Sequence, residues 1–382
     1  MKILYHHRTR AEDAQGIHIA EMTKAFERLG HHVDLVGIIS HSKKGDTSIE
    51  ESLISKIASK APAIVYEFME ILYNVYGFYK LRQQIKKTKP DFIYERYALF
   101  NLSGLLVSKI YGIPLIEEVN APLSKEKSLH AKLVLKSFAS WCEKIICSHS
   151  HKTIVVSTPL KRIMMESGVP SKKMVVIPNG IDEHYFNPHV DGCKIREKYK
   201  LKNKIVIGFV GWFRQWHGLE ELLETYAAQD MINKNIHILL VGDGPAFDAL
   251  MEITKKHNIL DKGVSFTGPV PRENIPEHIA AFDLALQPDV TDYASPIKLF
   301  EYISMGKGVI APDKENIVEI LSKDYPGLFK AGDWKNMGDV ILKTASSQDR
   351  VKEMGEIVFS IFKDKQYFWG NNAEKTLNLI NK

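Results

Sequence analysis

Ser295-Pro-Ile-Lys-Leu-Phe-Glu-Tyr-Ile-Ser-Met-Gly306, followed closely by Gly308-Val-Ile-Ala-Pro312, decides the fold class of this 382-residue chain. Ser295 can cap a helix, Pro296 suits a first helical turn, and Gly306 suits the left-handed residue that ends a helix. The stretch therefore predicts a short helix that leads directly into a buried strand, which is the repeating unit of α/β folds.

The predicted helix carries polar groups along one face. Lys298, Glu301 and Tyr302 recur at helical spacing, and the amino end of a helix offers free N–H groups and a partial positive charge to a phosphate. Lys298 would add a full charge there, and Glu301 can accept hydrogen bonds from a sugar diol. The same pattern also fits a surface helix whose lysine and glutamate face water, so both interpretations stay open at this point.

The stretch resembles the donor-site signature of glycosyltransferase family 4, whose members are retaining enzymes with the GT-B fold. Glu301 matches the second of the two glutamates in that signature, and Tyr293 stands at the position of the first. The resemblance implies an α/β protein with two Rossmann-like domains whose parallel sheets face each other across a cleft. It also implies that Glu301 contacts the donor ribose, and that Tyr293, Ser295, Pro296 and Ile297 complete the donor site.

Length and composition agree with two domains. The chain exceeds the size at which single cores stop growing, and 45% hydrophobic with 25% charged residues is typical of a globular protein. We expect an amino-terminal acceptor-side domain over residues 1–188, a donor-binding domain over 189–365, and over 366–382 a helix that returns to the first domain. Three cysteines without metal-ligand spacing, and the absence of a signal-peptide core or a membrane-crossing apolar run, predict a cytoplasmic protein.

Short apolar runs alternate with helical patterns through the amino-terminal half, as in a parallel sheet with helical crossovers. A helix is expected from about Gly16, between strands at Ile3–Tyr5 and His32–Val36. Further strands are expected at 91–94, 114–120, 144–147 and 153–157.

Polar residues follow two of these strands, at the edge where open α/β sheets bind ligands. The segment that begins at Gly16 resembles the opening of family 4 enzymes, so Gly16 is a donor-binding candidate and His18 an acceptor-side candidate. Glu118 is a second acceptor-side candidate. Asn120 stands where many family members carry a histidine near the donor sugar, and the resemblance implies a catalytic role for it. Residues of these types are also common in turns and first helical turns without any function, which remains the alternative.

The carboxyl-terminal half repeats the α/β pattern, and the turn after its first strand carries charge. This turn, Gly211-Trp-Phe-Arg-Gln-Trp-His-Gly218, resembles the family's diphosphate-binding turn. Arg214 is then a catalytic residue, because a guanidinium fork fits phosphate oxygens; the alternative is a surface role. His217 stands where the family has a lysine, so the positive charge is weaker unless Lys298 contributes or His217 is protonated. Strands are expected at 205–210, 236–241, 264–266 and 284–287.

Two more turns follow strands in this half. Gly242-Asp-Gly-Pro245 opens a helix, but it lacks the third glycine and the later acidic residue of a dinucleotide fingerprint. Gly268-Pro-Val-Pro271 resembles the loop whose backbone meets the nucleotide base, which makes Gly268 and Val270 donor-binding candidates. Earlier in the chain, residues 174–188 resemble the family's interdomain signature.

A basic and aromatic segment lies at residues 54–89. Seven Lys or Arg residues accompany only Glu67 and Glu70 there, and residues 1–188 carry 26 Lys or Arg against 19 Asp or Glu, a net charge of +7. Helices of this composition can lie on an anionic membrane surface. The alternative is that the aromatic residues pack on the sheet and the lysines are solvated. The first interpretation would place the protein peripherally on the inner face of the cell membrane.

These patterns together predict a retaining glycosyltransferase for a hexose or N-acetylhexosamine. The expected donor is a nucleotide-diphosphate sugar, with a UDP-sugar favoured, and the expected acceptor is a glycan or lipid-linked glycan of bacterial cell-surface polysaccharide synthesis. No metal or other cofactor is expected, because Arg214, Lys298 and a helix amino end would neutralise the diphosphate; no nucleic-acid partner is expected either. The alternatives are a GT-B sugar-nucleotide epimerase and a non-catalytic nucleotide-sugar-binding subunit, the latter motivated by Tyr293, Asn120 and His217.

Overall fold

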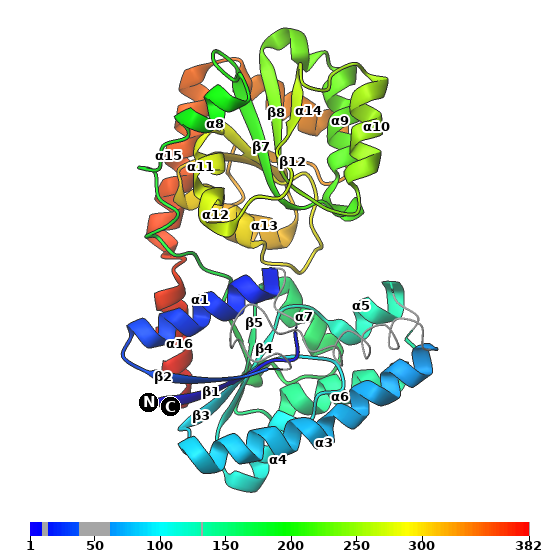
Figure 1. Ribbon diagram of the computed structural model, residues 1–382, viewed down its shortest axis with the longest axis vertical. Coiled ribbons are helices and arrows are strands. Elements are labelled where there is room, and N and C mark those ends of the chain that lie inside the picture. The colour runs from blue at the N-terminus through cyan, green and yellow to red at the C-terminus, as the bar shows by residue number, and fades with distance from the viewer. Residues whose placement is uncertain (10–13, 38–61, 131–132, 382) are drawn as a thin grey trace. The chain divides into compact units, whose positions relative to one another are not determined.

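The computed structural model describes residues 1–9, 14–37, 62–130 and 133–381 of the chain (Figure 1). The chain divides into two compact units, Met1–Pro178 with Trp369–Lys382, and Asn179–Phe368. The first boundary falls after Pro178, earlier than the predicted one after residue 188. Hydrogen bonds explain the difference, because Asn179 Nδ2 donates to the Ser295 carbonyl at 2.6 Å and the Ile181 N–H donates to the Tyr367 carbonyl at 2.9 Å.

The amino-terminal unit is built on a sheet of parallel strands in the order β2-β1-β3-β4-β5-β6. Successive residues of the first strand face opposite sides of the sheet: Ile3 and Tyr5 pack with α1 and α16, and Leu4 packs with α3 and α4. Its strands are Lys2–His6 (β1), His32–Val36 (β2), Phe92–Arg96 (β3), Leu115–Val119 (β4), Lys152–Val155 (β5) and Met174–Val176 (β6). Its helices are Ala14–Arg28 (α1), Ala63–Thr88 (α3), Ser103–Tyr111 (α4), Leu123–His130 (α5), Lys136–His149 (α6), Thr158–Glu166 (α7) and Trp369–Ile380 (α16).

Helix α16 completes the core of this unit, although it follows the whole second unit in sequence. Trp369, Ala373 and Leu377 share one apolar core with Met22 and Phe26 of α1. Figure 1 shows the two helices side by side on the sheet. The last helix therefore packs against the first one.

The second unit has parallel strands in the order β12-β11-β10-β7-β8-β9. Strand β7 pairs with β8 on one side and β10 on the other, so the strand order reverses there. Open α/β sheets bind ligands beyond the carboxyl ends of strands at such a point. Its strands are Ile205–Trp212 (β7), Ile236–Asp243 (β8), Val264–Phe266 (β9), Leu284–Leu286 (β10), Gly308–Pro312 (β11) and Leu328–Phe329 (β12). Its helices are Cys193–Lys198 (α8), Leu219–Ala228 (α9), Phe247–Lys256 (α10), Ile275–Ala280 (α11), Ile297–Ser304 (α12), Glu315–Leu321 (α13), Trp334–Ala345 (α14) and Gln348–Lys365 (α15).

The predicted α/β class with two parallel sheets is confirmed, and one predicted strand is wrong. Residues 144–147 belong to helix α6. Ala139, Cys142, Ile146 and Cys147 recur at helical spacing and are all buried, so the run is one face of a helix.

The stretch that indicated the fold forms α12 and β11 as predicted, but Ser295 does not cap the helix. Its Oγ accepts the Asn179 N–H at 3.0 Å instead, and Pro296 is the residue that precedes the first turn. Gly306 has the expected left-handed conformation, with φ of +65°. The Tyr302 hydroxyl accepts the Val210 N–H at 2.8 Å, which ties α12 to β7.

Candidate active site

Lys298 reaches from α12 to Gly211 near the end of β7, just before the turn that follows this strand. A Cβ on Gly211 would lie 2.9 Å from Lys298 Nζ, so a glycine leaves room for the ammonium. Gly211 also has φ of +147°, a conformation that side-chain-bearing residues rarely adopt. The ammonium lies 3.8 Å from the centre of the Phe209 ring. Burial lowers the pKa of Lys298 to about 7, although the charge of Glu301 opposes the shift.

His217 closes the same turn and carries no charge at neutral pH. Its Nδ1 accepts the Arg214 N–H at 3.3 Å. Burial, assisted by the charges of Lys298 and Arg214, lowers the pKa of His217 to about 2. Arg214 is partly exposed, with its guanidinium 5.1 Å from the centre of the Trp216 ring. The positive charge at this turn therefore comes from Lys298 and Arg214.

Glu301 is buried in α12, and its Oε1 accepts a hydrogen bond from Arg272 Nη1. Sequence reasoning missed Arg272. The available signal was its position directly after the loop Gly268-Pro-Val-Pro271, which resembles a base-binding loop. Its guanidinium lies 4.6 Å from the centre of the Phe186 ring.

The remaining donor-site candidates lie in the loops after β9 and β10. Ser295 is buried, whereas Tyr293, Pro296 and Ile297 are partly exposed before and at the start of α12. The Gly268 carbonyl accepts the N–H of Gly242, near the end of β8, at 3.1 Å, and Val270 packs against the edge of the core. Since loops at the carboxyl ends of parallel strands meet at one edge, these residues surround the same sheet edge as Arg214.

In the amino-terminal unit, a buried carboxylate organises the predicted residues. Glu118 Oε1 lies 3.0 Å from His18 Nε2 and 3.3 Å from Arg96 Nη1, and it accepts a hydrogen bond from Asn120 Nδ2. Glu118 Oε2 accepts the Tyr94 hydroxyl at 2.9 Å. Burial opposes ionisation, but the charges of His18 and Arg96 and the hydrogen bonds hold the pKa of Glu118 at about 2. Glu118 therefore holds Asn120 and Arg96 in place.

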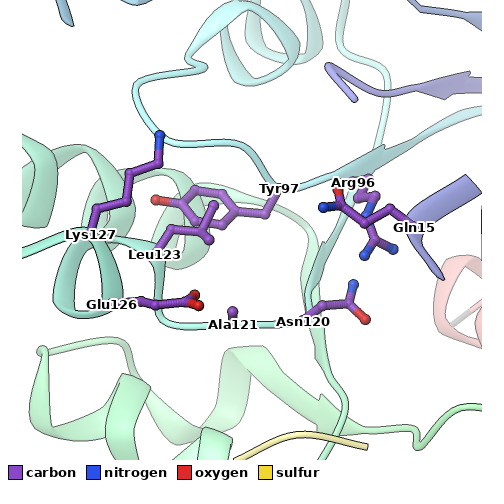
Figure 2. Close-up of a pocket in the computed structure, with 8 residues that line it drawn as sticks. All are labelled: Gln15, Arg96, Tyr97, Asn120, Ala121, Leu123, Glu126 and Lys127. Atoms are coloured by element: carbon purple, nitrogen blue, oxygen red, sulfur yellow. The ribbon is translucent and has the colours of Figure 1, made fainter. Parts of the chain in front are cut away.

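A pocket of about 450 Å³ opens beside this carboxylate (Figure 2). Asn120 lines it, His18 and Glu118 do not, and Gly16 follows a lining residue in α1. An aromatic ring, two amides, a carboxylate and two cationic groups suit a sugar that carries a charged substituent. The lining residues are Gln15, Arg96, Tyr97, Asn120, Ala121, Leu123, Glu126 and Lys127.

In the described part of the chain, no three His, Cys, Asp or Glu side chains gather where they could hold a metal ion. Among the described helices, none combines the length and apolarity needed to cross a membrane.

Known proteins resemble both units. Residues 15–185 match the model of Glycosyltransferase Family 4, and residues 193–358 match that of Glycosyl transferases group 1. Over 312 residues the chain is 25% identical to an uncharacterized glycosyltransferase of Methanocaldococcus jannaschii, covering 81% of this chain and 77% of that protein. It is 27% identical over 246 residues to the Escherichia coli UDP-Gal:alpha-D-GlcNAc-diphosphoundecaprenol alpha-1,3-galactosyltransferase, covering 61% of this chain and 59% of that enzyme. Anabaena HepE in complex with UDP has a similar structure, with a TM-score of 0.74 and 16% identity over 100% of both chains.

Lys298 should make binding of a nucleoside diphosphate depend on pH. The free protein has a lysine pKa of about 7, and a bound diphosphate favours the charged form, so binding above pH 7 takes up a proton and weakens as pH rises. We expect the dissociation constant of UDP to increase between pH 7 and 9, by up to about tenfold per pH unit. Calorimetry in two buffers of different ionisation enthalpy measures the proton uptake. Lys298→Arg, which stays charged, should remove the slope; the same slope in that variant would contradict the assignment.

Proposed function

Because the chain belongs to glycosyltransferase family 4, we propose that it moves a sugar from a UDP-sugar to a hydroxyl of a lipid-linked glycan, with retention of anomeric configuration. The observation that carries this proposal is the position of Lys298 beside Gly211 at the end of β7 and of Arg214 in the turn that follows. Cations fixed before the reaction stabilise the negative charge that develops on a leaving diphosphate. The GT-B fold agrees with the proposal, since the chain shares the fold of HepE.

The relatives and the pocket support these donor and acceptor classes. HepE holds UDP, and the Escherichia coli relative is a transferase from UDP-Gal to GlcNAc-diphosphoundecaprenol. In this chain Arg96 Nη1 donates a hydrogen bond to Glu118. Arg96 and Lys127 both line the pocket, and two cationic side chains there suit an acceptor diphosphate. Tyr97 and Asn120 suit the acceptor sugar. An acceptor of this kind would place the protein in synthesis of a bacterial surface polysaccharide.

Transfer breaks the bond from the anomeric carbon to the diphosphate oxygen and forms a bond from that carbon to the acceptor oxygen. The acceptor hydroxyl proton passes to the departing diphosphate, which leaves as UDP. We expect Arg214→Ala to lower the rate by about a hundredfold or more, the scale of losing one preorganised donor to a developing oxyanion. The measurement is release of UDP with lipid-linked acceptors. Arg350→Ala, which changes an exposed arginine of α15, is the matched control and should leave the rate unchanged. A near-normal rate for a folded Arg214→Ala protein would contradict the site.

The proposed reaction needs no metal ion, because Lys298 and Arg214 would supply the positive charge that a divalent cation supplies elsewhere. We expect activity to be the same with EDTA as with added magnesium or manganese. Strict dependence on either ion would show that the side chains alone do not neutralise the diphosphate.

A non-catalytic nucleotide-sugar binder is the second candidate, and the neutral ring of His217 favours it, because the turn then has one cation fewer than the family pattern. A sugar-nucleotide epimerase remains a further alternative on the same fold. Incubation with donor alone separates the three: a transferase slowly releases UDP, an epimerase converts the sugar, and a binder does neither.

The surface of α3 supports action at a membrane. Phe68, Leu72, Val75 and Tyr79, spaced three or four residues apart, are 54%, 66%, 72% and 61% exposed. Single exposed apolar residues are common, but a continuous stripe marks an interaction surface. Exposed basic residues follow it along the same helix: Lys80, Arg82, Lys86, Lys87 and Lys89 border its end. Residues 54–61 of the predicted segment lie outside the described residues.

Both acidic residues of α3 are engaged by other groups. Glu67 is buried and accepts the backbone N–H groups of Val134 and Leu135 at 2.6 and 2.7 Å. Glu70 lies 3.5 Å from Lys127 Nζ, a residue of the pocket. The exposed charge on α3 is therefore positive, and the helix adjoins the pocket at Glu70. This face suits an anionic bilayer that carries the acceptor.

We expect the protein to co-sediment with vesicles that contain anionic lipid at low salt and to be released at high salt, because each basic residue near the surface contributes about 1 kcal/mol and salt screens it. Replacing Lys80, Arg82, Lys86 and Lys87 with Gln should abolish binding without changing affinity for UDP. The matched control replaces four exposed lysines of the second unit with Gln, at positions Lys323, Lys330, Lys335 and Lys343. Equal binding to neutral vesicles, or equal loss in the control, would contradict the membrane surface.

A further inference from the structure

We propose that Arg272, supported by Phe186, is a positioning residue that holds Glu301 in the orientation needed to recognise the donor ribose. This inference rests on the proposed function, because it takes Glu301 as the ribose ligand. It also gives a role to residues 179–188. These residues end the segment that resembles the family's interdomain signature.

The geometry of Glu301 leaves one oxygen for a ligand. Among the described residues, Arg272 is its hydrogen-bond partner, and Arg272 takes Oε1 only. The Glu301 side chain is 3% exposed, so its carboxylate cannot turn freely toward water. A buried carboxylate that loses its partner is strongly destabilised, whereas one held by a guanidinium keeps its charge and its direction. Arg272 thus fixes Oε1 and directs Oε2 toward the remaining partner, which we assign as the ribose diol.

Phe186 fixes Arg272 in turn. The guanidinium lies 4.6 Å from the centre of the Phe186 ring, and Phe186 is itself buried. Arg272 is also the first residue of a short 3-10 turn, Arg272–Asn274, so its backbone belongs to a regular element. Its side chain remains 34% exposed, so part of it stays accessible while its Nη1 is bound to Glu301.

The segment that carries Phe186 also positions the start of α12. Asn179 holds Ser295 through two hydrogen bonds, its N–H to Oγ at 3.0 Å and its Nδ2 to the carbonyl at 2.6 Å. One short segment therefore fixes the chain before α12 through Asn179, and the carboxylate inside α12 through Phe186 and Arg272.

Comparing two ligands, one with and one without the ribose diol, separates a positioning role of Arg272 from a role in overall stability. We expect the wild-type protein to prefer UDP over 2′,3′-dideoxy-UDP, which has no diol for Glu301 to bind. Arg272→Gln should weaken the binding of UDP by about tenfold, which is the scale of a charge-assisted hydrogen bond. The affinity for the dideoxy analogue should stay nearly unchanged, so that the preference for UDP is lost. Phe186→Leu, which keeps an apolar side chain without the ring, should also reduce the preference for UDP, but by less. Arg214→Ala is the control, because loss of a phosphate contact should weaken the binding of both ligands equally.

Each possible outcome of these titrations either supports or overturns the role assigned to Arg272. A folded Arg272→Gln protein that keeps the wild-type preference overturns the inference. If that variant does not fold, Phe186→Leu decides, and an unchanged preference there overturns it. A wild-type protein that binds both ligands equally, while Arg214→Ala weakens both, overturns the inference but leaves the proposed function intact. A wild-type protein that binds neither ligand overturns both.

Discussion

The pairing of β7 with both β8 and β10 is the constraint on which the candidate site of the second unit depends. It places β7 beside β10, whose following loop leads into α12, and the Lys298 side chain of α12 reaches Gly211 near the end of β7. Lys298 can then lie against Gly211 and Phe209, and the resulting burial is what lowers its pKa. A side chain at Gly211 would force the ammonium away, so the position of Lys298 depends on a glycine at residue 211.

The amino-terminal unit uses buried charge in a different way. Glu118 is surrounded by donors, and those donors include Arg96 and Asn120, which line the pocket. A carboxylate with this many partners stays ionised in the interior because its hydrogen bonds offset the loss of water. Its contribution is to set the direction of the pocket's polar groups, while the pocket surface itself remains available to a ligand.

Local signals explain what the sequence predicted and what it did not. The helix and strand at 295–312 have clear start and stop signals, with Pro296 before the helix and Gly306 after it, and both elements form as predicted. Residues 144–147 were misassigned because a short apolar run cannot distinguish a strand from the buried face of a helix. Arg272 and the donors around Glu118 come from segments far apart in the sequence, so only the folded chain shows them together. The membrane hypothesis rested on composition, and the structure added which side of α3 is exposed.

The return of the chain through α16 has a consequence for biosynthesis. Met22 and Phe26 of α1 face a core that Trp369, Ala373 and Leu377 complete. A ribosome delivers the amino-terminal strands and α1 first, and it must make the whole second unit before α16 emerges. During that interval part of the α1 surface stays uncovered, which is the state in which nascent multidomain chains bind chaperones or aggregate. The second unit, by contrast, is continuous in sequence and can fold before translation of α16.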